Sequence, residues 1–135
     1  LASPKEKRKM SLFNWSSQGF KLHSGGTSNL LIDCNALTDE DWNTLAHLIY
    51  ENLPQHFRKV IGVPRGGLKL AEALKSYRFP NPEHPILIVD DVLTTGSSME
   101  KVRVELREVC IGAVVFARGE CPPWITPLWL WAGKP

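Results

Sequence analysis

Two adjacent carboxylates and a hydroxyl-rich segment are the residues of this sequence best suited to chemistry. Asp90 and Asp91 follow four apolar residues, and residues 94–98 then place four hydroxyl side chains around Gly96. Such a segment just before a helix offers hydroxyls and unpaired N–H groups at the positive end of the helix dipole, and so attracts an anion. Carboxylates accept hydrogen bonds from vicinal diols and also help to hold a hydrated Mg²⁺. The pattern predicts a phosphate site at 94–98, with sugar hydroxyls or a metal at the acids, as a ribose 5-phosphate requires.

A simpler interpretation of the same residues stays open. Serine and threonine commonly cap helices, and aspartate commonly forms turns. The segment is not a P-loop, because the pattern GxxxxGK[ST] is absent, and the dinucleotide fingerprint GxGxxG is absent as well. Residue types alone therefore do not decide between a phosphate site and an ordinary strand–helix turn.

A second glycine-rich segment, Gly62-Val-Pro-Arg-Gly-Gly67, also follows a predicted strand and precedes a predicted helix. Consecutive backbone N–H groups and the guanidinium of Arg65 together suit a pyrophosphate. Arg65, Gly66 and Gly67 are therefore candidate anion ligands. Taken alone, however, the segment is more typical of a glycine-rich turn without a ligand.

These segments need a scaffold that brings their loops together. Strands and helices alternate between residues 38 and 117, the pattern of an α/β sheet with crossover helices, whose ligands bind at the carboxyl ends of the strands. The loops 64–67, 90–98 and 118–121 would meet there.

A capping box of Thr38 and Asp41 begins the first helix, apolar residues at 42, 45, 46, 49 and 53 give it a buried stripe, and Pro54 ends it. The expected elements are hairpin strands at 20–24 and 29–33, strands at 59–63, 86–89 and 112–117, an edge strand at 124–131, and helices at 38–53, 68–77 and 97–109.

Composition narrows the class of protein. A chain of 135 residues with 43% apolar residues is long enough for one domain with a real core. A net charge of +2 gives no case for a nucleic-acid partner. No early apolar stretch resembles a signal peptide, and no run is long enough to cross a bilayer, so no membrane partner is expected. Cys34, Cys110 and Cys121 have no metal-binding spacing, so reduced thiols in a cytoplasmic protein fit best.

The segment ILIVDDVLTTGSS, residues 86–98, resembles the thirteen-residue signature of the type I phosphoribosyltransferases, which binds phosphoribosyl pyrophosphate (PRPP). The resemblance implies an α/β fold with a central, mostly parallel sheet flanked by helices, and a small N-terminal hood. It implies that Thr94, Thr95, Gly96, Ser97 and Ser98 bind the 5-phosphate. Asp90 and Asp91 would hold the ribose hydroxyls and, through water or those hydroxyls, the Mg²⁺ cofactor. Residues 65–67 would form the pyrophosphate loop, which in this family often contains an unusual cis peptide.

The base site resembles that of the orotate phosphoribosyltransferases. Residues 20–28, FKLHSGGTS, are similar to the hood of those enzymes, and residues 115–120, VFARGE, are similar to their strand followed by D-R-x-E. The resemblance implies that Ser24, Gly25 and Arg118 line the base site and that orotate and PRPP give orotidine 5′-phosphate and pyrophosphate. A purine or another pyrimidine as the base, and a non-catalytic PRPP-binding regulatory module, are the alternatives. The boundaries expected within one domain are a tail at 1–18, the hood at 19–36, a core at 38–120 and a C-terminal segment at 121–135.

One part of the family pattern is missing. Orotate phosphoribosyltransferases carry a long mobile lid before the signature strand, often closing across a dimer interface, so the resemblance leaves a homodimer open. Here only residues 78–85 join the helix to that strand, and Ala117 replaces the acid before the family's arginine. Neutralisation of the leaving pyrophosphate would then depend on Arg65 and Mg²⁺, with Lys69, Lys75 and Arg78 as further candidates.

Overall fold

The computed structural model describes residues 13–21, 27–32 and 36–131, and the chain divides into two compact units. The first unit contains a hairpin in which β1 (Phe13–Lys21) pairs antiparallel with β2 (Thr27–Ile32). The hairpin expected from the alternating pattern is confirmed. However, β1 begins at Phe13, inside the segment expected to be a tail, and its register shifts between Trp15 and Phe20 as in a β-bulge. Because of this irregularity, apolar and polar residues do not alternate strictly along the whole strand, so its first half is not predicted from the pattern.

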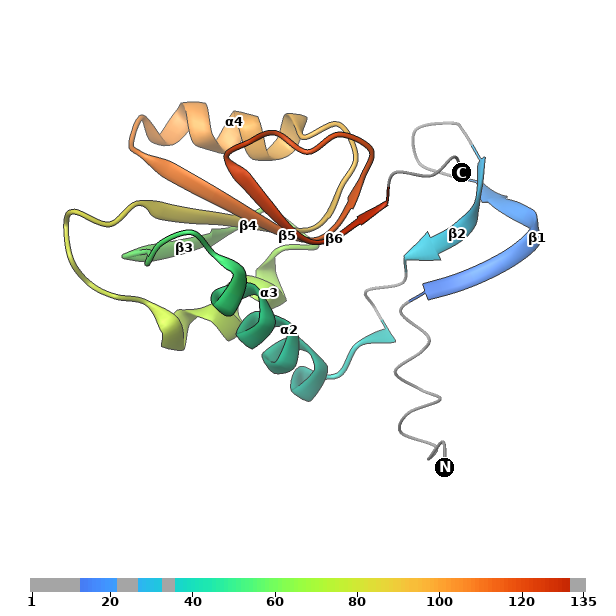
Figure 1. The fold of residues 1–135 in the computed structure, drawn as a ribbon, viewed down its shortest axis with the longest axis horizontal. Coiled ribbons are helices and arrows are strands. Elements are labelled where there is room, and N and C mark those ends of the chain that lie inside the picture. The colour runs from blue at the N-terminus through green and yellow to red at the C-terminus, as the bar shows by residue number, and fades with distance from the viewer. Residues whose placement is uncertain (1–12, 22–26, 33–35, 132–135) are drawn as a thin grey trace. The chain divides into compact units, whose positions relative to one another are not determined.

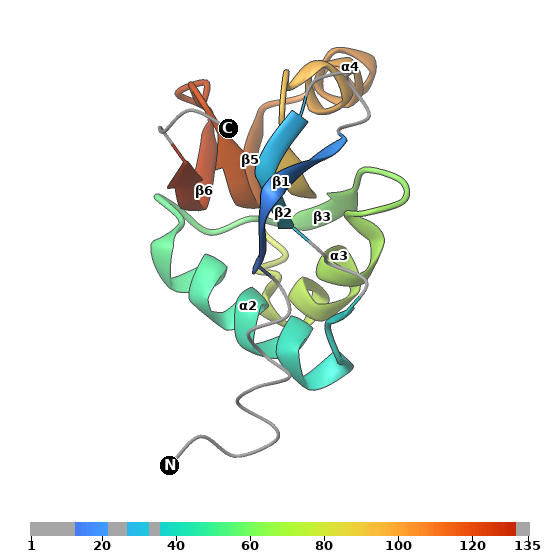
Figure 2. The ribbon, with the colours of Figure 1, turned by 90° about the vertical axis from the view of Figure 1, so that its right-hand side faces the viewer.

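The second unit, Trp42 to Ala132, is a parallel four-stranded sheet in the order β3-β4-β5-β6. Helices α2 and α3 cover one face of the sheet and α4 covers the other (Figures 1 and 2). The expected α/β architecture is therefore confirmed. Its elements are α2 (Asp39–Asn52), β3 (Lys59–Gly62), α3 (Leu68–Leu74) continued by the 3₁₀ turn η3 (Lys75–Tyr77), β4 (Ile86–Leu93), α4 (Ser97–Leu106), β5 (Cys110–Arg118) and β6 (Ile125–Trp131).

Helix α2 begins as the sequence predicts. The N–H of Thr38 donates to Oδ2 of Asp41 (2.9 Å), and the N–H of Asp41 donates to Oγ1 of Thr38 (3.1 Å). This reciprocal pair satisfies two amides that the first turn of a helix leaves unpaired. The predicted stripe is buried at Trp42, Leu45, Ala46 and Ile49, so α2 is held to the unit by one apolar face.

Strand β4 is the centre of the sheet and carries the predicted signature. Ile86, Leu87, Ile88 and Val89 are at most 1% exposed, as expected for a strand with partners on both sides and helices on both faces. The strand was expected to end at Val89, but it continues to Leu93 because β5 still pairs with it there, Leu93 opposite Ala117. The two acids therefore lie on the strand itself, where backbone pairing limits their freedom.

Strands β5 and β6 are parallel neighbours joined only by residues 119–124. Gly112 pairs with Ile125 and Arg118 with Trp131, so the link must return along roughly 20 Å of strand at 3.3 Å per residue. The seven backbone steps from Arg118 to Ile125 span at most about 25 Å. A turn in which the N–H of Ile125 donates to the carbonyl of Pro122 uses some of that length. The expected edge strand is thus present, but it is reached by a link with little slack instead of a crossover helix.

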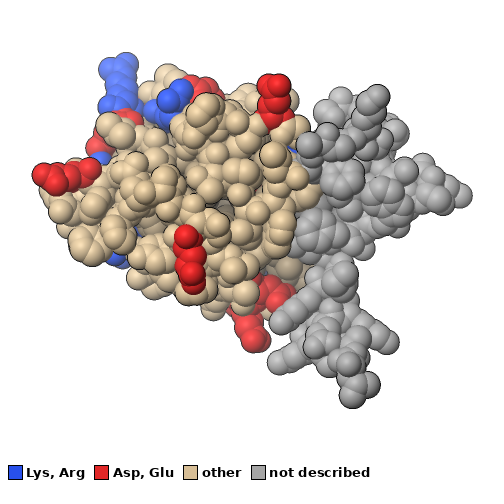
Figure 3. Space-filling view, in the orientation of Figure 1, with Lys and Arg blue, Asp and Glu red and all other residues tan. Residues whose placement is uncertain are grey.

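The surface of the described residues carries mixed charge. On the face drawn in Figure 3, acidic and basic side chains are scattered and no basic patch gathers. Within residues 13–21, 27–32 and 36–131, no helix combines the length and the apolar character needed to span a bilayer.

Candidate functional site

The two acids lie side by side on β4 but face different loops. The N–H of Asp91 donates to Oδ1 of Asp90 (2.8 Å), and the N–H of Val92 donates to Oδ1 of Asp91 (2.7 Å). Asp90 lines a small cavity together with the following loop. Asp91 instead lies against the loop after β3, because a Cβ added to Gly66 would overlap its carboxylate. The pair therefore stands between the two glycine-rich loops that the sequence singled out.

Burial changes the acidity of the first carboxyl. It raises the pKa of Asp90 from 3.8 to about 7, and the neighbouring Asp91 adds to the increase through a side-chain hydrogen bond and through its charge. A backbone hydrogen bond from Asp91 acts in the opposite direction but is outweighed. At neutral pH, Asp90 therefore populates both protonation states, so its carboxyl both donates and accepts hydrogen bonds.

The loop after β4 has the geometry of a small anion site. Gly96 has a φ of +80°, a left-handed conformation that favours glycine, and α4 begins at the next residue. Within the loop, Thr95 Oγ1 lies 3.0 Å from Ser97 Oγ and accepts from the Ser97 N–H at 3.3 Å. The first intrahelical bond, from Glu100 N–H to the carbonyl of Gly96, leaves the earlier amides of α4 outside the helical ladder. These unpaired N–H groups lie at the positive end of the helix dipole, where an anion is favoured.

The cavity at this loop has a volume of about 40 Å³. Drug-sized ligands generally occupy about 300 to 1,000 Å³, so this hollow has the scale of one phosphate group and not of a nucleobase. The residues expected at the 5-phosphate all line it, together with Asp90. Its lining is Asp90, Val92, Leu93, Thr94, Thr95, Gly96, Ser97, Ser98 and Met99.

The loop after β3 is a compact turn. The peptide bond between Pro64 and Arg65 is cis, as the resemblance implies for a pyrophosphate loop. The N–H of Gly67 donates to the carbonyl of Val63 (2.8 Å), and the N–H of Leu68 donates to that of Arg65 (3.1 Å). A Cβ on Gly67 would overlap the carbonyl oxygen of Val89. Gly67 therefore packs the loop onto β4, and its amide is already engaged, whereas the side chain of Arg65 is exposed.

The expected base-site residues are described only in part. Arg118 lies half-buried at the carboxyl end of β5, at the same edge of the sheet as the acids. Ser24 and Gly25 lie outside the described residues. Trp129, an indole that could stack on a base, pairs with Phe116 near that edge. Trp124 lies instead beside Gly112, near the amino end of β5, and is therefore remote from the other candidates.

The connection that replaces the lid lies at the opposite end of the sheet. The N–H of Phe79 donates to the carbonyl of Phe57, and Pro85 accepts from the N–H of Arg58, so residues 78–85 are bound to the segment that precedes β3. Lys75 pairs with Glu72 at 2.8 Å, and Arg78 Nε donates to the carbonyl of Lys75. Neither cation lies at the carboxyl ends of the strands.

The sequence did not reveal two features of the structure. The first is the contact between Gly66 and Asp91, because the spacing along the chain gives no sign of it. The second is a hollow of about 490 Å³, whose lining includes Arg58, Asn81 and Glu108 at the amino end of the sheet. We assign the site to the smaller cavity because it holds the acids, the hydroxyls and a helix N-terminus, whereas the larger is an open surface hollow beside an ion pair between Arg58 and Glu108.

Comparisons with known proteins address the fold. No family model and no curated protein matches the sequence. Among solved structures, the orotate phosphoribosyltransferase of Aeropyrum pernix aligns with a TM-score of 0.73 at 23% identity, over 93% of this chain and 92% of that chain. The enzyme of Mycobacterium tuberculosis H37Rv, solved with Fe(III) dicitrate, aligns with a TM-score of 0.66 at 17% identity over 93% and 95% of the two chains.

The orotate phosphoribosyltransferase of Francisella tularensis gives a TM-score of 0.66 at 17% identity, over 92% of this chain and 81% of that chain. Identities this low carry information about fold, and all three alignments cover most of both chains. Together with the parallel sheet and its flanking helices, they show that the chain has the type I phosphoribosyltransferase fold, with orotate phosphoribosyltransferases among its structural neighbours.

Proposed function

We propose that this protein is a phosphoribosyltransferase that moves the ribose 5-phosphate of PRPP onto a nucleobase, with orotate as the preferred base. The observation that carries the proposal is the contact between Gly66 and Asp91, which joins the loop after β3 to the acids of β4. A phosphate-sized cavity lies on the other side of the same acids. Three groups suited to pyrophosphate, ribose hydroxyls and 5-phosphate thus adjoin one another in the order in which PRPP carries those parts.

In the proposed reaction, a ring nitrogen of the base forms a bond to C1′ of PRPP, and the bond from C1′ to the pyrophosphate oxygen breaks. The leaving pyrophosphate takes the electron pair. Positive charge develops at C1′ and negative charge on the leaving group, so groups that bind the leaving group accelerate the step. Arg65 and the N–H of Gly66 would bind pyrophosphate, while Gly67 would contribute by packing, because its own N–H donates to Val63.

The remaining residues would hold the sugar in place. Asp90 and Asp91 would accept hydrogen bonds from the ribose hydroxyls, and residues 94–98 would hold the 5-phosphate at the start of α4. Anchoring both ends of the donor restricts C1′ to a small volume, which supplies the positional advantage of a bound reactant.

The residues present fit Mg²⁺ of the kind that substrates help to bind. No group of three or more His, Cys, Asp or Glu side chains with metal-binding geometry occurs in the described part of the chain. Mg²⁺ commonly takes only one or two carboxylates from a protein and completes its shell with water and substrate phosphates. Asp90 and Asp91 offer oxygen ligands of that type. When bound, the ion would neutralise charge on the pyrophosphate.

The proposed choice of base rests on Arg118. A guanidinium at the carboxyl end of β5 would pair with a carboxylate on the base, which orotate has and the common purines lack. A purine or another pyrimidine is the alternative substrate within the same reaction class. Trp129 near that edge is the residue that favours this alternative, because an indole ring stacks on any base.

A second candidate function, a non-catalytic PRPP-binding module, is favoured by one observation. The short connection at residues 78–85 is bound to the amino end of the sheet, so it offers no cation to the leaving group. Without further cations, the protein would bind PRPP and turn over slowly or not at all.

One assay distinguishes these functions. The protein is mixed with PRPP, Mg²⁺ and a panel of bases, and pyrophosphate release is followed beside calorimetric PRPP binding. Turnover with orotate supports the first proposal, turnover with other bases alone supports the second substrate class, and binding without turnover supports the regulatory module. Failure of PRPP to bind, together with an Asp91→Asn variant that behaves as the parent, would refute all three. Glu105→Gln, an exposed position on α4, is the matched control.

A further inference from the structure

Trp124 is the residue by which the link between β5 and β6 is attached to the rest of the unit. Its carbonyl accepts from the N–H of Gly112 (2.8 Å), and a Cβ placed on Gly112 would lie 2.9 Å from Cζ3 of its ring. The same Cβ would lie 3.0 Å from Cε of Met99. Gly112 therefore leaves the space that the indole occupies, and the ring packs against the buried cluster that contains Met99 and Ile125.

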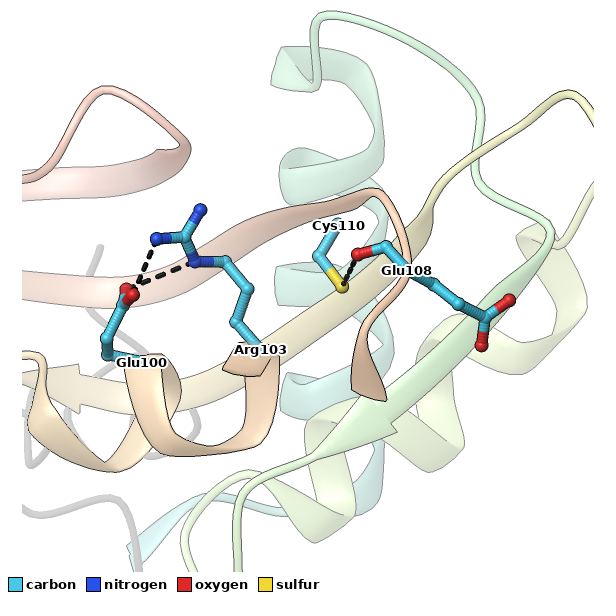
Figure 4. A network of polar contacts seen from close by, with 4 residues as sticks. All are labelled: Glu100, Arg103, Glu108 and Cys110. Carbon is cyan, nitrogen blue, oxygen red and sulfur yellow. Dashed lines mark hydrogen bonds and ion pairs between the residues drawn. The ribbon is translucent and has the colours of Figure 1, made fainter. Parts of the chain in front are cut away.

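Arg103 of α4 lies over this ring. Its guanidinium carbon lies 4.8 Å from the ring centroid of Trp124, within the range of a cation–π contact. Glu100, one turn earlier on α4, fixes the guanidinium by two hydrogen bonds, from Nε at 3.1 Å and from the second nitrogen at 2.5 Å (Figure 4). We call Glu100, Arg103 and Trp124 the tryptophan clamp.

The clamp connects two parts of the candidate site. Helix α4 begins at the phosphate-sized cavity, and Met99 lines that cavity while also packing near Trp124. The link, residues 119–124, follows directly after Arg118, and its last residue is Trp124 of the clamp. Because residues 119–124 have little slack and include Pro122 and Pro123, whose φ angles are restricted, a displacement of Trp124 is transmitted to the carboxyl end of β5.

We propose that the tryptophan clamp positions Arg118 relative to the loop at residues 94–98, and so sets the affinity for the base without touching it. The inference rests on the proposed function in one respect, the role of Arg118 towards the base. Arg103 and Trp124 are thus positioning residues, and their removal loosens the base site while leaving the 5-phosphate site in place.

Kinetics provide the first test. Arg103→Met keeps an unbranched apolar stem but removes the charge, and Arg103→Lys restores a cation that stacks on the ring. In Arg103→Met, the KM for the base should rise by about two- to fivefold, the size of a partly exposed cation–π contact, with the KM for PRPP unchanged. Arg103→Lys should recover part of the loss, and Lys101→Met, exposed on the same helix, should match the parent. Equal increases in both KM values, or no increase in either, would overturn the proposal.

A structural measurement separates failure of the clamp from failure of the proposed function. The backbone amide resonance of Arg118 should shift in Arg103→Met and in Trp124→Leu, but not in Lys101→Met. That amide lies roughly 20 Å along β5 from Gly112, which the indole contacts, and so is too far for a direct ring effect. Shifts confined to the neighbourhood of residues 100–103 and 124 would refute the clamp even if the parent proved inactive with every base. If Trp124→Leu does not fold, Arg103→Met decides the question alone.

Discussion

Asp90 and Asp91 are adjacent residues with different surroundings. Asp90 lines the cavity of the loop that precedes α4, whereas Asp91 lies on Gly66 of the loop that follows β3. Two carboxylates side by side would repel a phosphate if both faced it. Because they point to separate loops, one ligand can present its anionic groups to the loops and its hydroxyls to the acids.

The raised pKa of Asp90 predicts how stability depends on pH. The folded carboxyl titrates with a pKa of about 7 and the unfolded one near 3.8, so between these values the folded protein binds more protons. Stability attributable to this group should therefore fall as pH rises from about 4 to about 7 and stay constant above that. Asp90→Asn removes the titration, so this variant should be more stable than the parent at pH 8.

Denaturant unfolding in EDTA at several pH values measures this effect. The difference between parent and Asp90→Asn should grow from pH 5 to pH 7 and then level off. Glu105→Gln, which removes an exposed carboxylate from α4, provides the control. Parallel stability curves for the parent and Asp90→Asn across this range would show that burial does not perturb this carboxyl.

Gly66 is the second residue whose role is open to a sharp test. Any Cβ there overlaps the carboxylate of Asp91, so Gly66→Ala must displace either the loop after β3 or the acid. We expect PRPP affinity to fall by about tenfold or more, corresponding to at least 1.4 kcal/mol. Calorimetric titration with PRPP and Mg²⁺ measures the change. Gly119→Ala, where an added Cβ meets no atom within 4 Å, should leave PRPP affinity near that of the parent although its φ of +88° disfavours alanine.

At the scale of elements, the position of each cation depends on which end of the sheet its element occupies. The loop carrying Arg65 lies at the carboxyl ends of the strands, whereas the connection carrying Arg78 is bound to the amino end. Arg65→Ala should therefore lower kcat/KM by about 100-fold, a common effect of losing one group that stabilises the transition state. Arg78→Ala should leave it unchanged. Pyrophosphate release under identical conditions compares the two variants, and a large loss in Arg78→Ala would contradict the placement.

Most elements could be predicted because their signals are local. The Thr38–Asp41 box, the apolar stripe of α2 and the four buried residues of β4 each depend on a few adjacent side chains. The end of β4 depends instead on how far β5 continues beside it, and the return from β5 to β6 depends on the packing of Trp124. Both are set by contacts between distant segments, so no local pattern reveals them.

The candidate site could be predicted to a similar extent. Topology alone indicates that Arg65, Asp91 and the loop at 94–98 approach one another, because parallel strands direct their carboxyl ends to one edge. The engaged amide of Gly67 and the remote position of Trp124 could not be predicted, because each depends on a particular hydrogen bond or ring contact. The distance of Lys75 and Arg78 from the site could not be predicted either, because it depends on where α3 ends.

For the whole molecule, the second unit places the two candidate anion-binding loops on one sheet. The loop after β3 and the loop after β4 belong to neighbouring strands and touch through Gly66 and Asp91, so their separation is fixed before any ligand arrives. A ligand that reaches both loops therefore loses less conformational freedom than two separate anions. PRPP is such a ligand, whereas ribose 5-phosphate and pyrophosphate each reach one loop.

This arrangement predicts an order of stabilisation in thermal unfolding with Mg²⁺. PRPP should raise the Tm more than ribose 5-phosphate and pyrophosphate supplied together at the same concentrations. A ligand at 100 times its Kd adds about 2.7 kcal/mol to the free energy of unfolding, so differences in affinity become visible as differences in Tm. In Asp91→Asn the advantage of PRPP over the two fragments should shrink, while Glu105→Gln should retain it. If the fragments stabilise the parent as much as PRPP does, the two loops do not bind one ligand, and the order of groups inferred from Gly66 and Asp91 is wrong.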